Sequence, residues 1–321
     1  MAKGNLFLGT AHGSVGDATL YRRNGQQVSR VRVRKIGNPR TEGQAKNRAV
    51  LSTLGVAYSY MQGIVDHSFQ GEESKTKNMQ KFMKLNQGIA REIGGAPAFD
   101  AQSPAYNFVF KGEAVLRPNP YAISRGTLPS VQVTAPGEGH FEDGFRVESL
   151  LNLLADAENT TYNDVCAALG VELGTQLTFC VISDDNFTGT PSEQNMPVSY
   201  GNFHYARVIL APDDGDGTKK AFNDDSGTVT FINTNSANKG TVSFDDTAAV
   251  TVDGKSYPLA AGVIVSNYNG KWLRSNCDMV VAADYTDSNT MSEVFPSYMN
   301  AEIQPDSDLY LNQSKKLTGE A

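Results

Sequence analysis

The sequence predicts an α+β protein with an N-terminal basic β-hairpin, a helical hairpin and then a mostly antiparallel β-sandwich. Three observations predict it: an Asn-Gly turn at residues 24–25 between two alternating segments, apolar residues at helical spacing from 45 to 93, and short strand-like segments separated by turn residues beyond residue 118. Because the helical and strand-forming segments are separate in the sequence, the pattern favours α+β over α/β.

The predicted β-hairpin spans residues 17–34. Asn24 and Gly25 both tolerate positive φ angles, and together they are the strongest two-residue signal for a hairpin turn. The register that this turn sets places Arg30 opposite Thr19. Strand alternation then puts the even-numbered arginines of the second strand on one face and its valines on the other.

Two antiparallel helices are predicted next. The first begins at Thr41, where Thr41 and Gln44 fit a capping box, and continues to residue 65. The second covers residues 76–93 and ends at a pair of glycines. Their apolar residues recur every three or four positions, so each helix has one face that must be buried.

The rest of the chain is predicted to be mainly β-structure, with one short helix at residues 161–169 and hairpin turns at 253–254 and 269–270. The candidate strands are 130–134, 144–150, 176–183, 204–210, 227–233, 240–244, 248–252, 255–259, 262–267 and 272–282. The predicted domains are 1–95 (the basic hairpin arm plus the helical hairpin), a proline-punctuated linker at 96–117, the β-sandwich at 118–308 and a tail at 309–321.

Charge is unevenly distributed along the chain. Residues 1–50 contain 10 Lys and Arg against two acidic residues, a net charge of +8, whereas the remainder has 18 against 33, a net charge of −15. A basic arm on an acidic body suggests that the arm meets a polyanion or an acidic neighbour.

Nine basic residues form the candidate binding site of this arm. They are Arg22, Arg23, Arg30, Arg32, Arg34, Lys35, Arg40, Lys46 and Arg48. Guanidinium groups spaced along a strand suit repeated contacts with nucleic-acid phosphates. Two alternatives stay open: pairing with acidic residues of a neighbouring subunit, and a face that is simply solvated.

No motif for catalysis, a metal or a cofactor is recognised, so the sequence predicts a non-enzyme with no cofactor. The four histidines have no metal-ligand spacing, and the acidic turn at 213–217 lacks the calcium-loop register. The three cysteines are expected to be buried or half-buried free thiols in a reducing compartment. No secretory signal and no membrane span is expected, because no apolar run approaches about 20 residues.

Several segments resemble an uncharacterised family that occurs in bacterial and small phage genomes. They are Gly13-Ser-Val-Gly-Asp17, Tyr21-Arg-Arg-Asn-Gly-Gln-Gln-Val28 and Asn38-Pro-Arg-Thr-Glu-Gly-Gln44 with Arg48 after it; residues 262–266 and 270–275 also resemble phage-borne relatives. Members of the family open with a Gly-x-Val-Gly segment, a basic hairpin and Asn-Pro-Arg-Thr before a helix. Ser14 stands where they usually have lysine. The resemblance implies a shared fold and a phage-related setting, but no established function and no catalytic residues.

Together these observations predict a self-assembling structural protein. The expected type is a phage coat or other virion protein, made in the host cytoplasm, that forms a homo-oligomer, shell or filament. Its basic arm is expected to contact the genome or neighbouring subunits. Two other classes remain as alternatives: a non-catalytic nucleic-acid-binding accessory protein, and a surface or receptor-binding β module.

Overall fold

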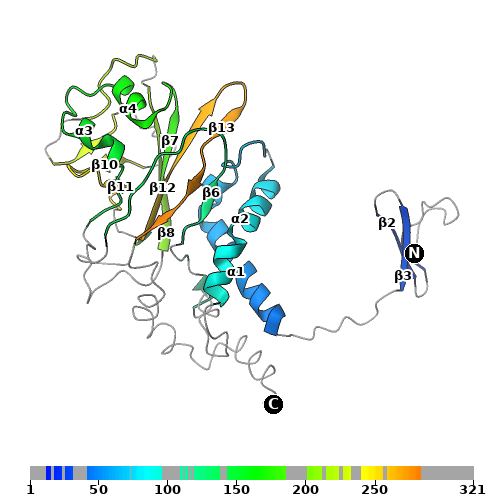
Figure 1. The fold of residues 1–321 in the computed structure, drawn as a ribbon. Coiled ribbons are helices and arrows are strands. Elements are labelled where there is room, and N and C mark those ends of the chain that lie inside the picture. Colours follow the sequence, from blue (N-terminus) through cyan, green and yellow to red (C-terminus); the bar gives the residue numbers. More distant parts are fainter. Residues whose placement is uncertain are drawn as a thin grey trace. The chain divides into compact units, whose positions relative to one another are not determined.

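The computed structural model describes residues 12–15, 18–23, 26–31, 42–72, 74–95, 109–110, 113–114, 116, 119–137, 143–185, 201–211, 215–223, 227–232, 240–255 and 259–282. The fold is α+β, as predicted (Figure 1). The helices are α1 (Glu42–Val65), α2 (Lys75–Gly95), α3 (Leu151–Leu154) and α4 (Tyr162–Leu169), with a 3-10 helix at Glu148–Leu150. The chain divides into two compact units, residues 1–41 and residues 42–321.

The smaller unit contains a three-stranded antiparallel sheet in the order β1-β2-β3. Its strands are β1 (Gly13–Val15), β2 (Ala18–Arg23) and β3 (Gln26–Val31). The predicted hairpin register is confirmed, because Thr19 pairs with Arg30. Strand β1, which precedes the predicted hairpin, adds to its β2 side, with Gly13 opposite Leu20.

The larger unit is built on a five-stranded antiparallel sheet. Its order is β13-β12-β7-β8, and β15 also pairs with β12. The strands are β7 (Gln176–Asp184), β8 (Gly201–Ile209), β12 (Ala260–Tyr268), β13 (Trp272–Arg274) and β15 (Val280–Val281). From Ala260 to Ser266, β12 is buried on both sides, so this sheet forms the middle layer of the unit.

A second antiparallel sheet covers one face of the central sheet. Its order is β11-β10-β9, made of β9 (Val229–Thr230), β10 (Val242–Phe244) and β11 (Val250–Val252). Phe179 of β7 meets Phe244 and Phe231 there, with ring centroids 5.8 Å and 6.2 Å away. This pair of sheets corresponds to the predicted sandwich.

The helical hairpin covers the opposite face of the central sheet. Cys180 and Tyr205 are paired neighbours on that face, one position along from Phe179, and the Tyr205 ring lies against Gly63 of α1. Figure 1 shows α1 and α2 on one side of β12 and the small sheet with α3 and α4 on the other. The larger unit therefore has three layers.

The helices are thus part of the β-rich unit, which differs from the predicted grouping of arm and helices in residues 1–95. Ala57 and Met61 of α1 and Phe82 of α2 are buried in the same apolar core as the strands. Burying these helical faces requires a partner surface, and the central sheet supplies it. The other predicted boundaries, 96–117, 118–308 and 309–321, fall partly outside the described residues and stay predictions.

The short strand β6 (Ala122–Ser124) joins the helical layer to the sheet. On one side the Asn86 side chain of α2 donates to the carbonyl oxygen of Ala122 (3.1 Å) and accepts from its N–H (2.8 Å). On the other side β6 pairs with β14 (Cys277–Asp278). The Ser124 hydroxyl adds bonds to the carbonyl oxygens of Ser68 and Ser275, both 2.8 Å long.

Local sequence signals were accurate where they specify geometry. Helix α4 begins with the capping box of Thr161 and Asp164 and ends at Gly170, which has φ of 65°.

The strand predicted at 130–134 is wrong, since only one isolated bridge, from Thr134 to Arg146, forms there. The strand predicted at 272–282 is three short strands, because β14 pairs with β6 while β13 and β15 pair with β12. The remaining pair, β4 (Val109–Phe110) and β5 (Glu113–Ala114), forms a small separate hairpin.

Candidate functional site

The arginines of the arm lie on two different faces of its sheet. Because side chains alternate along a strand, Tyr21 and Arg23 of β2 share a face with Arg30 of β3, whereas Arg22 lies on the opposite face. The guanidinium carbon of Arg30 is 5.6 Å from the centroid of the Tyr21 ring, a cation–π contact. We call the face that carries Tyr21, Arg23 and Arg30 the arm face.

The other residues of the predicted basic cluster have no described side chains. Arg32, Arg34, Lys35 and Arg40 lie outside the described residues. Lys46 and Arg48 lie in α1 and therefore in the larger unit, and their side chains are outside the described part. The structure brings Arg23 and Arg30 to one face and separates Arg22 from them. An arginine–tyrosine face of this kind can bind phosphate oxygens or carboxylates.

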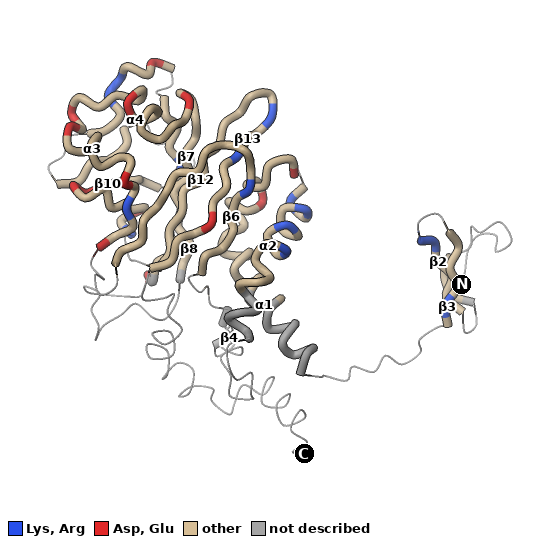
Figure 2. Tube along the Cα trace, in the orientation of Figure 1, with Lys and Arg blue, Asp and Glu red and all other residues tan. Residues whose placement is uncertain are grey.

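Charge is also segregated within the larger unit. Figure 2 shows Lys and Arg positions along α2 and near β13, and Asp and Glu positions around α3 and α4, where Lys and Arg positions also lie beside α4 and β10. The basic residues of α2 include Lys75, Lys77, Lys81 and Lys84. Part of the acidic excess of the chain is therefore concentrated at one end of this unit, away from α2.

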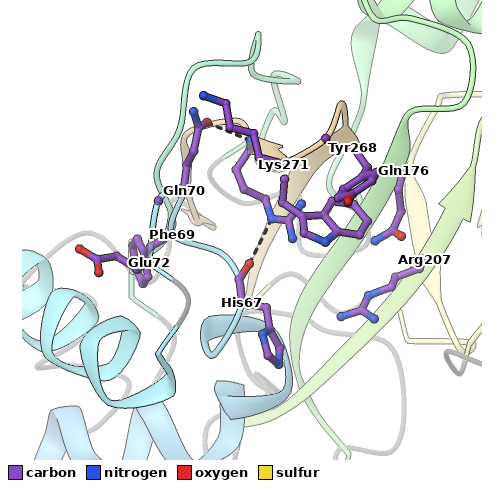
Figure 3. A pocket seen from close by; sticks show the side chains of 12 residues that line it. His67, Phe69, Gln70, Glu72, Gln176, Arg207, Tyr268 and Lys271 are labelled. Carbon is purple, nitrogen blue, oxygen red and sulfur yellow. Dashed lines mark hydrogen bonds between the residues drawn. The ribbon is translucent and has the colours of Figure 1, made fainter.

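A cavity of about 710 Å³ lies in the larger unit, between the helical hairpin and the edge of the central sheet (Figure 3). One wall is the connection between α1 and α2, residues 67–72, and another is the β12–β13 hairpin, residues 268–274. Gln176 of β7 and Arg207 of β8 complete the lining. Cavities of this size hold small ligands in many proteins.

Hydrogen bonds to Arg274 and Gln70 fix the walls of this cavity. The Gln70 Oε1 atom accepts from the backbone N–H groups of Arg274 and Thr127, both at 3.1 Å. The Arg274 Nε atom donates to the carbonyl oxygen of His67 at 3.1 Å. Gly126 packs so closely that a Cβ atom there would lie 2.0 Å from the Arg274 carbonyl oxygen. The cavity is therefore preformed and does not depend on a ligand for its shape.

The cavity has a positive electrostatic character. Burial and, as the smaller cause, the neighbouring charge of Arg207 together lower the pKa of Arg274 to about 10. Glu72 is the acidic residue of the lining, but its carboxylate lies 3.9 Å from Lys77 Nζ, and Figure 3 shows it turned away from Arg207. Arg207 and Arg274 thus place two neighbouring guanidinium charges at this cavity.

A second polar cluster is centred on Asp185, at the end of β7. Its carboxylate accepts from Ser183 (2.9 Å), Asn202 (2.9 Å) and His204 (3.0 Å) and pairs with Lys255 (3.3 Å). Burial acts to raise the pKa of Asp185, but the hydrogen bonds outweigh it and hold the pKa below its ordinary value. Ser183 donates to the carboxylate and not to His204, so this arrangement is a structural ion cluster and not a nucleophile with its base.

The three cysteines are buried free thiols, as predicted. Burial raises the pKa of Cys166 to about 11 and that of Cys277 to about 12, which makes both thiols poor nucleophiles. The same cause raises the pKa of Cys180. Among the described residues, no group of three or more His, Cys, Asp or Glu side chains is placed to hold a metal ion.

Sequence reasoning did not identify the cavity residues. The signal that was present is the pair Tyr268 and Trp272 on either side of the Asn269-Gly270 turn, with Arg274 two residues after Trp272. The two aromatic residues pair across β12 and β13, with ring centroids 5.3 Å apart. The residues on the opposite wall come from the α1–α2 connection, about 200 positions earlier, so no local pattern links them.

Comparisons of the chain with protein-family models, with curated proteins and with solved structures find no match in any of the three. In the part of the chain that the structure describes, none of the helices has the length and apolar character needed to cross a membrane.

Proposed function

We propose that this protein is a self-assembling structural protein, a phage coat or other virion component, whose basic arm contacts the genome or neighbouring subunits. The observation that carries the proposal is the arm face, on which Arg23 and Arg30 lie beside Tyr21 in a small unit of its own. An assembling protein needs such a contact element in addition to a rigid body. The resemblance of the opening segments to phage-borne proteins is in keeping with the proposal.

The charge distribution supports the same function. The first 50 residues carry a net charge of +8 and the remainder −15, so the arm is attracted both to nucleic acid and to the acidic surface of another copy. Arg23 and Arg30 are offset by four residues along the sheet, which is about 13 Å at the usual rise per residue. Two guanidinium groups at that separation contact separate phosphates or separate carboxylates, not the same group.

The second candidate is a non-catalytic nucleic-acid-binding accessory protein that stays a small oligomer. It is favoured by the same arm face, because Tyr21 adds an aromatic ring to the two arginines. The two candidates differ in whether the protein assembles, so one set of measurements separates them.

The test uses full-length protein freed of nucleic acid by nuclease treatment and examined by light scattering and electron microscopy. Regular shells or filaments are expected, and a protein that remains monomeric at high concentration at every salt concentration would refute self-assembly. A small oligomer that binds nucleic acid favours the accessory protein instead.

The role of the arm face is tested with Arg23→Gln, and Arg22→Gln is the matched control because it removes the same charge from the adjacent residue on the opposite face. If the arm face binds phosphate, Arg23→Gln should weaken nucleic-acid binding more than the control and lower the log–log salt slope by about 0.9 on duplex DNA or ~0.7 on single strands. If the arm face pairs with a neighbouring subunit, Arg23→Gln should impair assembly in nucleic-acid-free buffer. Equal behaviour of both variants in both assays refutes a role for this face.

A further inference from the structure

The cavity beside β13 has the features of a ligand site that the proposed function does not use. It lies wholly within the larger unit, its walls are fixed by hydrogen bonds, and its volume is about 710 Å³. An inference about it stands independently of the arm.

The cationic side chains of the cavity indicate that its ligand is an anion. Arg207, Lys271 and Arg274 line it, and the carboxylate of Glu72 is directed to Lys77. Within the described part of the chain, Arg274 makes no ion pair, and its Nη2 atom donates no hydrogen bond. Its Nε and Nη1 atoms are used for the carbonyl oxygens of His67 and Leu273. A bound anion would accept a hydrogen bond from the Nη2 atom of Arg274 and would be attracted by the positive charges that line the cavity.

The aromatic side chains indicate that the ligand also carries a planar ring. Trp272 and Tyr268 line the cavity, yet they remain 48% and 62% exposed. The guanidinium carbon of Arg274 lies 4.4 Å from the centroid of the Trp272 ring, which fixes that ring. Large aromatic side chains that stay exposed beside cationic groups are typical of sites where a base stacks next to its phosphate.

We propose that this cavity binds a nucleotide, with its phosphate at Arg207, Lys271 and Arg274 and its base against Trp272 and Tyr268. The nucleotide is either free or one residue of a single-stranded nucleic acid. Figure 3 shows that Arg207, Lys271 and Tyr268 come from different strands and turns that meet at this cavity, so both parts of a nucleotide are within reach of it.

The chain contains a single tryptophan, Trp272, so its fluorescence reports on this cavity alone. We would titrate full-length protein with AMP, adenosine, inorganic phosphate, a 12-residue oligothymidylate and polyglutamate. Saturable quenching by AMP is expected, with binding at least about tenfold weaker for adenosine and for phosphate, since each lacks one half of the contacts. Tighter binding of the oligonucleotide than of AMP identifies the strand as the source, and the reverse order identifies a free nucleotide.

Two variants test the assigned contacts without disturbing the walls. Lys271→Gln changes an exposed turn residue and should weaken AMP binding about tenfold, because one charge-assisted contact is lost. Lys84→Gln removes the same charge from an exposed position of α2 outside the cavity and should leave the affinity unchanged. The oligonucleotide titration is repeated in the Arg23→Gln protein, which separates binding at the cavity from binding at the arm.

Three results would overturn the proposal. The first is the absence both of a Trp272 response and of retention in equilibrium dialysis, with AMP and with the oligonucleotide, at millimolar concentration. The second is binding of phosphate alone as tight as that of AMP, which leaves the aromatic residues without a role. The third is an equal response to polyglutamate, which assigns the cavity to an acidic peptide instead.

Discussion

The side chain of Asn86 is expected to be the most important single polar group for attaching the helical hairpin to the sheet. It is fully buried, and its amide makes three hydrogen bonds: to the carbonyl oxygens of Phe82 (2.9 Å) and Ala122 (3.1 Å) and from the N–H of Ala122 (2.8 Å). Asn86→Leu keeps a side chain of similar size but removes all three bonds.

The cost of this substitution follows from the groups that it leaves without partners. Ala122 is itself buried, so neither its N–H nor its carbonyl oxygen can form a replacement hydrogen bond with water. A buried group that loses its partner costs about 1–3 kcal/mol, so two of them cost about 2–6 kcal/mol. That is a large share of the roughly 5–15 kcal/mol by which a typical domain is stable.

Urea unfolding followed by circular dichroism and Trp272 fluorescence measures the effect. Gln80→Leu, the same kind of change at an exposed position of α2, is the matched control and should change the free energy of unfolding by about 0.5 kcal/mol or less. A loss below about 1 kcal/mol in Asn86→Leu would show that the Asn86 bonds do not hold the layers together.

A second variant of this residue tests the same reasoning through pH. Asn86→Asp keeps an acceptor for the Ala122 N–H but places a carboxylate against two carbonyl oxygens. Burial and this repulsion raise the pKa of the introduced carboxyl, so the loss of stability should be full at neutral pH and should diminish as pH falls through that raised value. Stability that is independent of pH in this variant would contradict the argument.

Three further outcomes are expected from the contacts described above. Gly126→Ala should lower the free energy of unfolding by at least about 1–3 kcal/mol in urea titrations, because the added Cβ would lie 2.0 Å from the backbone oxygen of Arg274. Gly262→Ala should cost less, since its Cβ would lie 2.8 Å from the Cys277 sulfur, a side-chain atom; adding Cys277→Ala should recover part of the loss in a double-mutant cycle. Asp185→Asn should lower the free energy of unfolding by about 1–3 kcal/mol at pH 7. Because the pKa of Asp185 is below its ordinary value in the folded state, that difference should disappear as pH falls below about 3.9 and through the lowered value.

Much of the fold could be predicted because its local elements obey local rules. The Asn24-Gly25 turn was enough to set the pairing of Thr19 with Arg30, and the short helix predicted at 161–169 agrees with α4 to within one residue. The α+β class also followed from the separation of helical and strand-like segments. The turn and the helix depend on residues within about ten positions of one another, and sequence patterns predict such local elements well.

The layers and the cavity could not be predicted in the same way. Strand β6 is only three residues long, and its partners Asn86 and Cys277 lie far from it in the sequence. The faces of the arm, by contrast, follow from the predicted register, because the same alternation that puts Arg30 on the face of Thr19 separates the adjacent Arg22 and Arg23. Composition identified the charge of the arm, but only the register identified its face.

The position of β6 has a consequence for how the chain is made. The strand that pairs with it, β14, and the strand at the centre of the sheet, β12, are both translated near the end of the described sequence. Helices α1 and α2 are synthesised long before either strand exists, so the core into which Met61 and Phe82 pack stays incomplete until β12 and β14 are made. Contacts between segments so distant in the sequence form slowly, and apolar surface that stays exposed until they form is prone to aggregation. The core of the larger unit is therefore expected to be complete only once β12 and β14 are in place, and part of the apolar surface of the helical hairpin stays exposed until then.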